Sequence, residues 1–221
     1  MKKRIHLLAS GVLMAIAPAA TFAQDWDGIY TGVSLAYADH DATHSFSNGA
    51  PTDGSDPDGA LVGGFIGYAL QNGNIVYGIE ADFEGGDVSG TFNNPGGLGS
   101  SGEADLNLQG SIRAKVGLAG SLGGNPTHYY GTVGWAAGKF DFQGGPPFGG
   151  FVGNGYSETL DGWTIGAGIE TAIGGNLSFR TEYRYTDHGT SSGNLAPGFA
   201  GVGMPVSVEQ HSFRIGLRID L

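Results

Sequence analysis

Ser212-Phe-Arg-Ile-Gly-Leu-Arg-Ile-Asp-Leu221 alternates strictly between two kinds of side chain. Successive side chains of a β-strand point to opposite faces, so this stretch predicts a strand with one apolar and one polar face. Arg214, Arg218 and Asp220 share the polar face, and the apolar face carries only Phe, Ile and Leu. A strand of this kind needs lipid or a protein core on one side and polar partners on the other.

The same alternation recurs upstream and gives eight predicted strands in all. They are Ile29–Ala38, Ala60–Leu70, Ile75–Glu84, Asp105–Leu118, His128–Phe140, Gly162–Thr171, Leu177–Tyr185 and Val208–Leu221. Long gaps follow the first, third, fifth and seventh segments, and the other gaps are shorter. An even number of strands, with short turns at one rim and long loops at the other, is typical of an outer-membrane β-barrel.

The first 23 residues are predicted to be a secretory signal peptide. Lys2, Lys3 and Arg4 precede the apolar run Leu7–Ala17, and small residues lead to a cleavage point after Ala23. The predicted domains are therefore 1–23, the signal peptide, and 24–221, the outer-membrane β-barrel domain. After cleavage, seven basic and 21 acidic residues remain, a net charge of −14, which argues against nucleic-acid binding.

Charged residues on the polar faces balance one another. Six of the seven remaining basic residues and six acidic residues lie on these faces, and we predict that they form a charge network inside the barrel: Glu80, Asp82, Glu84, Arg113, Lys115, Glu170, Arg180, Glu182, Arg184, Arg214, Arg218 and Asp220. A buried unpaired charge is costly, so a sealed lumen requires such matching. Eight strands enclose a lumen that side chains fill. The network should therefore exclude anything much larger than water or a small ion.

Aromatic residues on the apolar faces cluster near the strand ends. We predict that they form two lipid-interface girdles: Tyr77, Tyr129 and Phe179 at the short-turn rim, and Phe83, Trp163, Tyr183, Tyr185 and Phe213 at the long-loop rim. A soluble barrel such as a lipocalin, with its apolar face turned inward, also fits the alternation. The charge matching and the girdles favour the membrane barrel.

Several segments resemble a known group of proteins. Gly162-Trp-Thr-Ile-Gly-Ala-Gly-Ile-Glu170 and Arg180-Thr-Glu-Tyr-Arg-Tyr-Thr-Asp-His-Gly189 are similar to strands of the small alphaproteobacterial outer-membrane β-barrels, the porin-family or opacity-type proteins. Trp26–Val33 and His211–Leu217 resemble the first and last strands of that group. The resemblance implies an eight-stranded barrel in the outer membrane, with roles in envelope integrity and surface contact. Chains of the group usually end in Phe, which the barrel-assembly machinery reads, whereas this sequence ends in Leu221.

The predicted long loops, 39–59, 85–104, 141–161 and 186–207, are rich in Gly, Ser, Asn and Pro and are poor places for a precise active site. Asp39, His40, Asp41 and His44, with Asp53, Asp56 and Asp58 nearby, form a candidate cation site, but a solvated acidic loop is the preferred interpretation. His211 and Ser212 do not suggest a hydrolase, because neighbours on a strand point to opposite faces.

The sequence thus predicts an all-β fold, an eight-stranded antiparallel up-and-down transmembrane β-barrel with four long extracellular loops, and termini in the periplasm. The expected function is non-enzymatic: envelope structure and surface interaction, as a surface antigen of the Gram-negative outer membrane. The alternatives are a narrow channel for ions or small solutes and, less favoured, a lipid-modifying enzyme. No cofactor, metal or nucleic acid is expected. The expected partners are outer-membrane lipid and lipopolysaccharide, the barrel-assembly machinery, and a host or surface partner bound through the loops.

Overall fold

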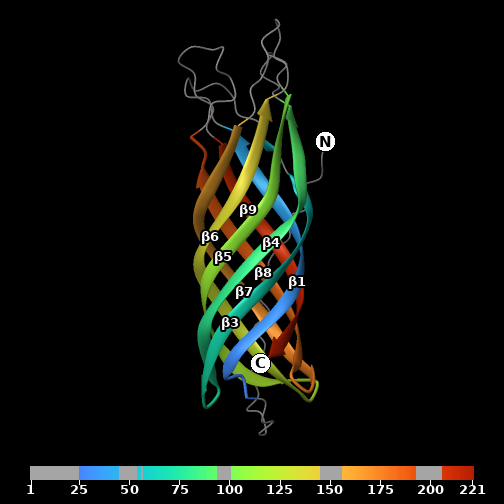
Figure 1. Ribbon diagram of the computed structural model, residues 1–221, viewed down its shortest axis with the longest axis vertical. Coiled ribbons are helices and arrows are strands. Elements are labelled where there is room, and N and C mark those ends of the chain that lie inside the picture. The colour runs from blue at the N-terminus through green and yellow to red at the C-terminus, as the bar shows by residue number, and fades with distance from the viewer. Residues whose placement is uncertain (1–24, 45–53, 56, 94–100, 145–155, 193–205) are drawn as a thin grey trace, which may run out of the picture.

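Eight long strands form a closed antiparallel barrel in the computed structural model, which describes residues 25–44, 54–55, 57–93, 101–144, 156–192 and 206–221 (Figure 1). The strands are β1 (Gly28–His44), β3 (Asp58–Asn72), β4 (Ile75–Asn93), β5 (Ser101–Leu122), β6 (Asn125–Gly144), β7 (Tyr156–Gly174), β8 (Leu177–Thr190) and β9 (Val206–Asp220). Each pairs with its neighbours in sequence order, and β9 pairs with β1 to close the barrel. A two-residue strand, β2 (Gly54–Ser55), pairs with the end of β1. The predicted eight-stranded closed barrel is confirmed. No helix in the described ranges is long and apolar enough to span a membrane.

The strands are longer than predicted, and this corrects the predicted loops. Each predicted segment lies on one strand, apart from Leu221, which follows the end of β9. β4 continues to Asn93 and β5 begins at Ser101, so the expected loop 85–104 is mostly strand. Most residues of the four longer connections, which lie together at one rim, are outside the described residues, and these include Asp53 and Asp56. Four long loops are therefore not confirmed.

Tight turns join the strands at the short-turn rim, opposite the rim with the four longer connections, which we call the long-connection rim. Gly123 and Gly124 both have positive φ, +59° and +87°, as a type I′ hairpin turn requires. The turn between β3 and β4 contains Gly73 at φ +62°. The last strand ends at this rim, where the Leu221 amide donates to the Ile29 carbonyl at 3.0 Å (Figure 1).

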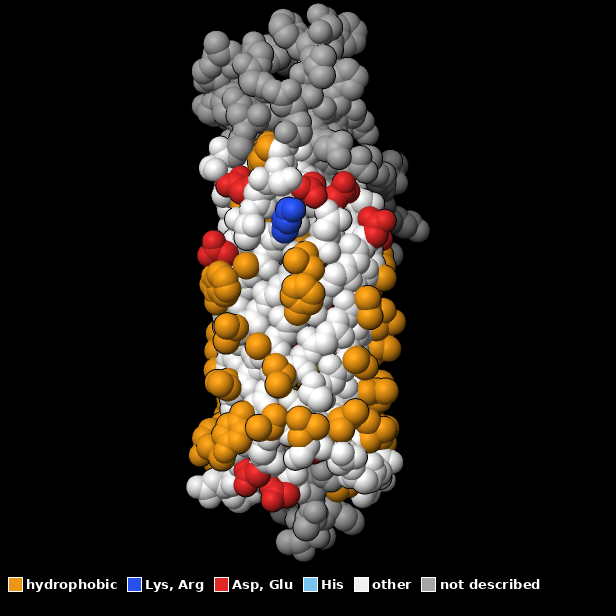
Figure 2. All heavy atoms as spheres, in the orientation of Figure 1, with side chains coloured by type: hydrophobic (Ala, Val, Ile, Leu, Met, Phe, Trp, Pro, Cys, Tyr) orange, Lys and Arg blue, Asp and Glu red, His pale blue; other side chains and the backbone are white. Residues whose placement is uncertain are grey.

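The outer wall of the barrel is apolar over most of its height. Val62 on β3 and Ile79 on β4 are 65% and 63% exposed, and Val33, Ile112 and Val133 are similarly outward-facing. Figure 2 shows hydrophobic side chains along the wall and acidic side chains gathered above them, next to the long-connection rim. The prediction that the apolar faces point outward is confirmed by these exposures.

Three aromatic rings inside the barrel face glycines on the adjacent strand. Tyr30 is paired in register with Gly67, Phe65 with Gly32, and Tyr130 with Gly168. A Cβ atom at any of these glycines would collide with the facing ring. Part of the high glycine content therefore makes room for bulky interior side chains.

The interior has two large regions with different chemistry, and a smaller apolar cluster of Trp26, Tyr30, Phe65, Ala69 and Val76 lies at the short-turn end. Toward the short turns lies the charge network, the twelve residues predicted from the sequence. Toward the long-connection rim lies a region that we call the apolar stack: Ala36, Ala38, Ala42, Leu61, Val88, Leu106, Phe140, Phe142, Leu160, Val206 and Val208.

Candidate functional site

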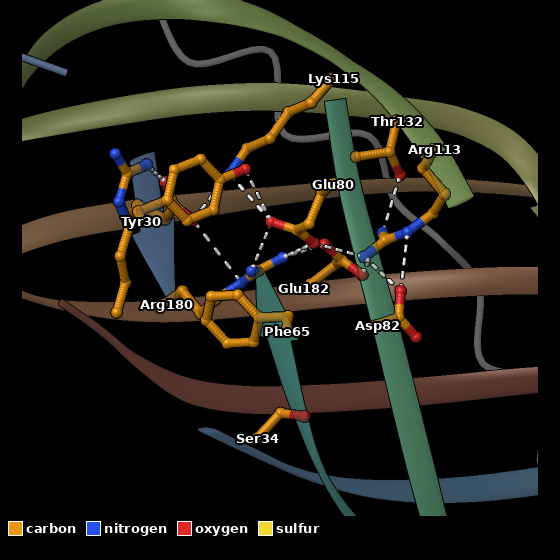
Figure 3. A network of polar contacts seen from close by, with 12 residues as sticks. Tyr30, Ser34, Phe65, Glu80, Asp82, Arg113, Lys115, Thr132, Arg180 and Glu182 are labelled. Carbon is orange, nitrogen blue, oxygen red and sulfur yellow. Dashed lines mark hydrogen bonds and ion pairs between the residues drawn. The ribbon is translucent and has the colours of Figure 1, made fainter. Parts of the chain in front are cut away.

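The centre of the charge network is Glu80 on β4 (Figure 3). Its carboxylate accepts hydrogen bonds from Arg113 at 2.5 Å, from Arg180 at 2.9 and 3.1 Å, and from the Tyr30 hydroxyl at 3.0 Å. These partners come from β5, β8 and β1, so one carboxylate links strands on different sides of the lumen. Strand alternation explains why these side chains meet, because each of them occupies an inward-facing position of its strand.

Glu182 on β8 is the second acidic centre. Arg113 lies 2.8 Å and Arg180 lies 2.7 Å from its oxygens, and the Tyr130 hydroxyl donates at 3.0 Å. Both arginines are shared with Glu80. The four charges therefore form a closed ring of alternating sign across the lumen.

A second group of charges lies next to the centre, on the side of the apolar stack. Arg184 contacts Asp82 through two hydrogen bonds of 3.1 Å, and Arg214 contacts Glu84 at 2.5 Å. Gln109 donates to Glu84 at 2.9 Å. Paired guanidinium–carboxylate contacts of this kind fix the geometry of both side chains.

A third group lies at the short-turn end, around Glu170 on β7. Lys115 and Arg218 contact Glu170 at 2.7 and 3.0 Å, and the His128 ring lies 3.4 Å from it. Arg218 also contacts Asp220 at 2.6 Å. Asp220, whose side chain is 19% exposed, is at the edge of the lumen, whereas the other eleven charged side chains are 5% exposed or less.

Aromatic rings lie over three of the six cations of the network, and sequence reasoning missed these rings. The Lys115 ammonium lies 3.9 Å from the Tyr130 ring centre, and the Arg218 guanidinium lies 3.8 Å from that of Tyr30. Arg180 lies 4.4 Å from the Phe65 ring centre. A parity argument could have placed them: Tyr129 was assigned to the outer face, so its neighbour Tyr130 has to face inward.

The network joins six acidic and six basic side chains into one ion-paired unit. Removing one partner of a buried pair leaves an uncompensated charge, which costs roughly 3–5 kcal/mol. The charged residues come from β4, β5, β7, β8 and β9, and Tyr30 and Tyr130 join β1 and β6 to them, so the arrangement is suited to holding these strands in one register and fills the lumen with side chains.

The predicted girdle residues all lie on the outer wall. Tyr77, Phe83, Trp163, Phe179, Tyr183 and Phe213 are exposed, and Tyr129 and Tyr185 are partly exposed. Sequence reasoning missed Trp135, which is paired in register with Trp163 and donates from its indole nitrogen to Asp161 at 3.0 Å.

Strand alternation separates the residues of the candidate cation site, and it also separates His211 from Ser212. Asp39 and Asp41 point outward while His40 points into the barrel, so these three cannot ligate one cation. Ser212 faces the lumen, whereas His211 lies outside, against the Tyr183 hydroxyl at 2.7 Å. In the described part of the chain, no group of three or more His, Cys, Asp or Glu side chains is arranged to hold a metal ion.

Comparison with known proteins agrees with this architecture. The model of the family described as outer membrane protein beta-barrel domain matches residues 7–218. The 31 kDa outer-membrane immunogenic protein of Brucella melitensis is 35% identical over 187 residues, which cover 78% of this chain and 75% of the relative. The 22 kDa outer membrane protein of Rhizobium leguminosarum bv. viciae is 32% identical over 201 residues, with 89% and 79% covered.

A solved structure shares the fold. The outer membrane protein OprG of Pseudomonas aeruginosa is similar with a TM-score of 0.56 at 14% sequence identity, and the match covers 87% of this chain and 95% of that chain. At this identity the likeness concerns the fold alone. The family model and the alphaproteobacterial relatives show that this chain belongs to the outer membrane protein β-barrel domain family and is a protein of the Gram-negative outer membrane.

Proposed function

We propose that this protein is a non-enzymatic structural component of the outer membrane that exposes its long-connection rim at the cell surface. The observation that supports this most is the filled lumen. Eleven of the twelve charged side chains are almost completely buried in mutual contacts, and the apolar stack lies above them. A barrel of this kind is stiff and has no wide passage for solutes.

The surface role rests on the relatives and on the location of the connections. The Brucella proteins similar to this chain are named as immunogenic outer-membrane proteins. In this proposal the short turns and both ends of the barrel chain face the periplasm, and the long connections face outward, where they contact a host or environmental partner. The girdle residues contact outer-membrane lipid and lipopolysaccharide, and the barrel-assembly machinery inserts the chain.

A deletion strain tests the structural part of the proposal. Cells without the protein should release more of a periplasmic marker enzyme and should become more sensitive to detergent, and the wild-type gene should restore both. Unchanged integrity together with slower uptake of a small solute would favour the narrow channel instead. An altered lipid A mass spectrum on overexpression would favour a lipid-modifying enzyme.

An accessibility experiment tests the orientation. An epitope inserted between residues 149 and 150, in the connection from β6 to β7, should bind antibody on intact cells. The matched control is the same epitope in the short turn between Gly123 and Gly124, which should bind only after the outer membrane is permeabilised. The opposite result would invert the proposed orientation.

A further inference from the structure

Two imidazole rings lie inside the barrel among the apolar residues of the stack. His40 on β1 is 2% exposed and His188 on β8 is 1% exposed. The Phe140 ring packs edge-on against both, with centroid distances of 6.3 and 5.1 Å. The two imidazoles are nearly parallel, at an interplanar angle of 21° and a centroid distance of 6.4 Å, so a charge on one ring acts directly on the other.

The hydrogen bonds of both rings suit their neutral forms. Nε2 of His188 lies 3.1 Å from Oε1 of Gln210 on β9, and an amide oxygen only accepts hydrogen bonds, so Nε2 carries the proton. A second proton would add at Nδ1, which is buried and has no acceptor among the described residues. The His40 ring hydrogen-bonds to the backbone of Pro57, a neutral group that does not balance a positive charge.

The charges around the two rings do not compensate imidazolium. His188 is influenced by Asp187, which lies on the outward-facing side of β8, and by Arg184 of the charge network, and these two influences oppose each other. Glu158, nearer the rim on β7, is engaged by the Ser192 hydroxyl at 2.7 Å. The strands packed around the rings carry their charges at this level on outward-facing positions, among them Asp39, Asp87, Asp105, Asp141, Asp161 and Glu209.

These conditions oppose protonation in the folded stack. Burial among apolar side chains is the largest influence on both groups, and it lowers the pKa of His40 to about 3 and also lowers the pKa of His188. A histidine in an open, hydrated segment has a pKa of about 6.5. As the pH falls below this value, an opened stack takes up protons that the closed stack does not, so the closed stack loses stability.

We propose that His40 and His188 form an acid-sensitive switch, in which protonation of the two rings opens the apolar stack at the long-connection rim. The acids on the outer face of this level place it in water, so protons of the medium reach it once it opens. The charge network lies farther along the same strands and is held by its own ion pairs, so it keeps the rest of the barrel closed. The inference does not rest on the proposed surface partner.

The test is hydrogen exchange of the full barrel in lipid vesicles, at about pH 7.5 and about pH 5, with each rate divided by the intrinsic rate at that pH. Residues 38–42 on β1 and 208–212 on β9 report on the stack, and residues 112–116 on β5 report on the network. Each imidazole that stays neutral in the closed stack should raise the opening constant about 30-fold between these pH values. The wild-type stack should therefore exchange at least about 30-fold faster in acid, and the network should change little.

Two substitutions remove the titrating groups and keep a ring in each place. His40→Phe should lower the acid-induced increase about 30-fold, His188→Phe should also lower it, and the double variant should lose nearly all of it. The compared quantity is the ratio between the two pH values, so hydrogen bonds lost at both of them do not affect it. His211→Phe, on the outer wall of β9, is the matched control and should keep the full increase.

Slower gel mobility after heating establishes that each variant has folded. The proposal is overturned if the wild-type stack exchanges no faster at about pH 5 than at about pH 7.5. It is equally overturned if the folded single variants, or the double variant, show the wild-type ratio. An equal increase in the network residues would mean that the whole barrel opens, which also contradicts a switch confined to the stack.

Discussion

The two interior regions show opposite polarity on the same strands. In the charge network, Arg214 faces inward while its neighbour Phe213 faces outward. Five residues earlier on β9, Val208 faces inward and Glu209 outward. β7 shows the same arrangement near the long-connection rim, where Leu160 faces inward and Asp161 faces outward.

The surroundings of the barrel explain this inversion. Where lipid surrounds the wall, apolar side chains point out and the polar ones are forced inside, where they have to pair. Where water surrounds the wall, the strand has the ordinary arrangement, with apolar residues in the core and acids outside. The apolar stack is therefore the core of a part of the barrel that rises above the lipid.

The largest effect is expected for Arg113→Ala in the charge network. Arg113 contacts Glu80, Asp82 and Glu182, so the substitution leaves three buried carboxylates short of a partner. We expect a loss of about 3–5 kcal/mol in the free energy of unfolding, measured by urea titration of the barrel in lipid vesicles. Lys139→Ala, at an exposed position on β6, should change it little. Equal stability of Arg113→Ala and the wild type would show that the network is not a closed ion-paired unit.

A smaller effect is expected in the apolar stack. Leu106→Ala removes a buried side chain on β5 without leaving a charge unpaired, and should cost about 2–4 kcal/mol. The control is Leu108→Ala on the same strand, which faces outward and should cost less in the same titration. If Leu108→Ala were the more damaging change, the inward assignment of Leu106 would be wrong.

The glycine positions opposite aromatic rings should be sensitive to one added methyl group. Gly67→Ala places a Cβ against Tyr30, so the ring has to move away from Glu80. We expect a cost of about 1–3 kcal/mol in urea titration. Adding Gly67→Ala to a Tyr30→Ala background tests the cause: if overlap with the ring dominates, the added methyl group should cost much less there than in the wild type. An equal cost in both backgrounds would contradict this.

The smallest effect is expected at the boundary between the two regions. Thr164 and Thr186 share a buried hydrogen bond of 3.0 Å, and Thr186 lies between Arg184 and His188 along β8. Thr164→Val keeps the shape and should cost about 0.5–1.5 kcal/mol. Thermal unfolding monitored by gel mobility should detect the shift. A cost as large as that of Arg113→Ala would place this pair within the charge network.

The sequence predicted the strands well where lipid is expected to surround them. From Phe213 to Leu221 the apolar residues face the expected lipid and the polar residues face the lumen, so the alternation identifies both the strand and its two faces. Beyond Glu84 the pattern is lost, because β4 has a register shift between Gly85 and Val88 and the exposed residues around Val88, Asp87 and Ser89, are polar. The Gly- and Asp-rich ends of the strands were therefore mistaken for loops.

The pairing inside the lumen could be predicted only in part. The identities of the twelve charged residues followed from parity, but which acid contacts which base depends on register between strands distant in sequence. Arg180 and Glu80, separated by 100 residues, illustrate this. The inward position of His40 was also missed, because the sequence grouped it with Asp39 and Asp41 in a loop, whereas the extended strand turns it inward.

The central claim is that side chains close the lumen, and single-channel recording in planar lipid bilayers tests it most directly. The folded wild-type barrel should give no stepwise conductance, and Arg214→Ala and Arg218→Ala should lower stability without producing regular steps. Reproducible steps from the wild type, altered in size or ion selectivity by these two substitutions, would contradict the account and establish a narrow conducting pore.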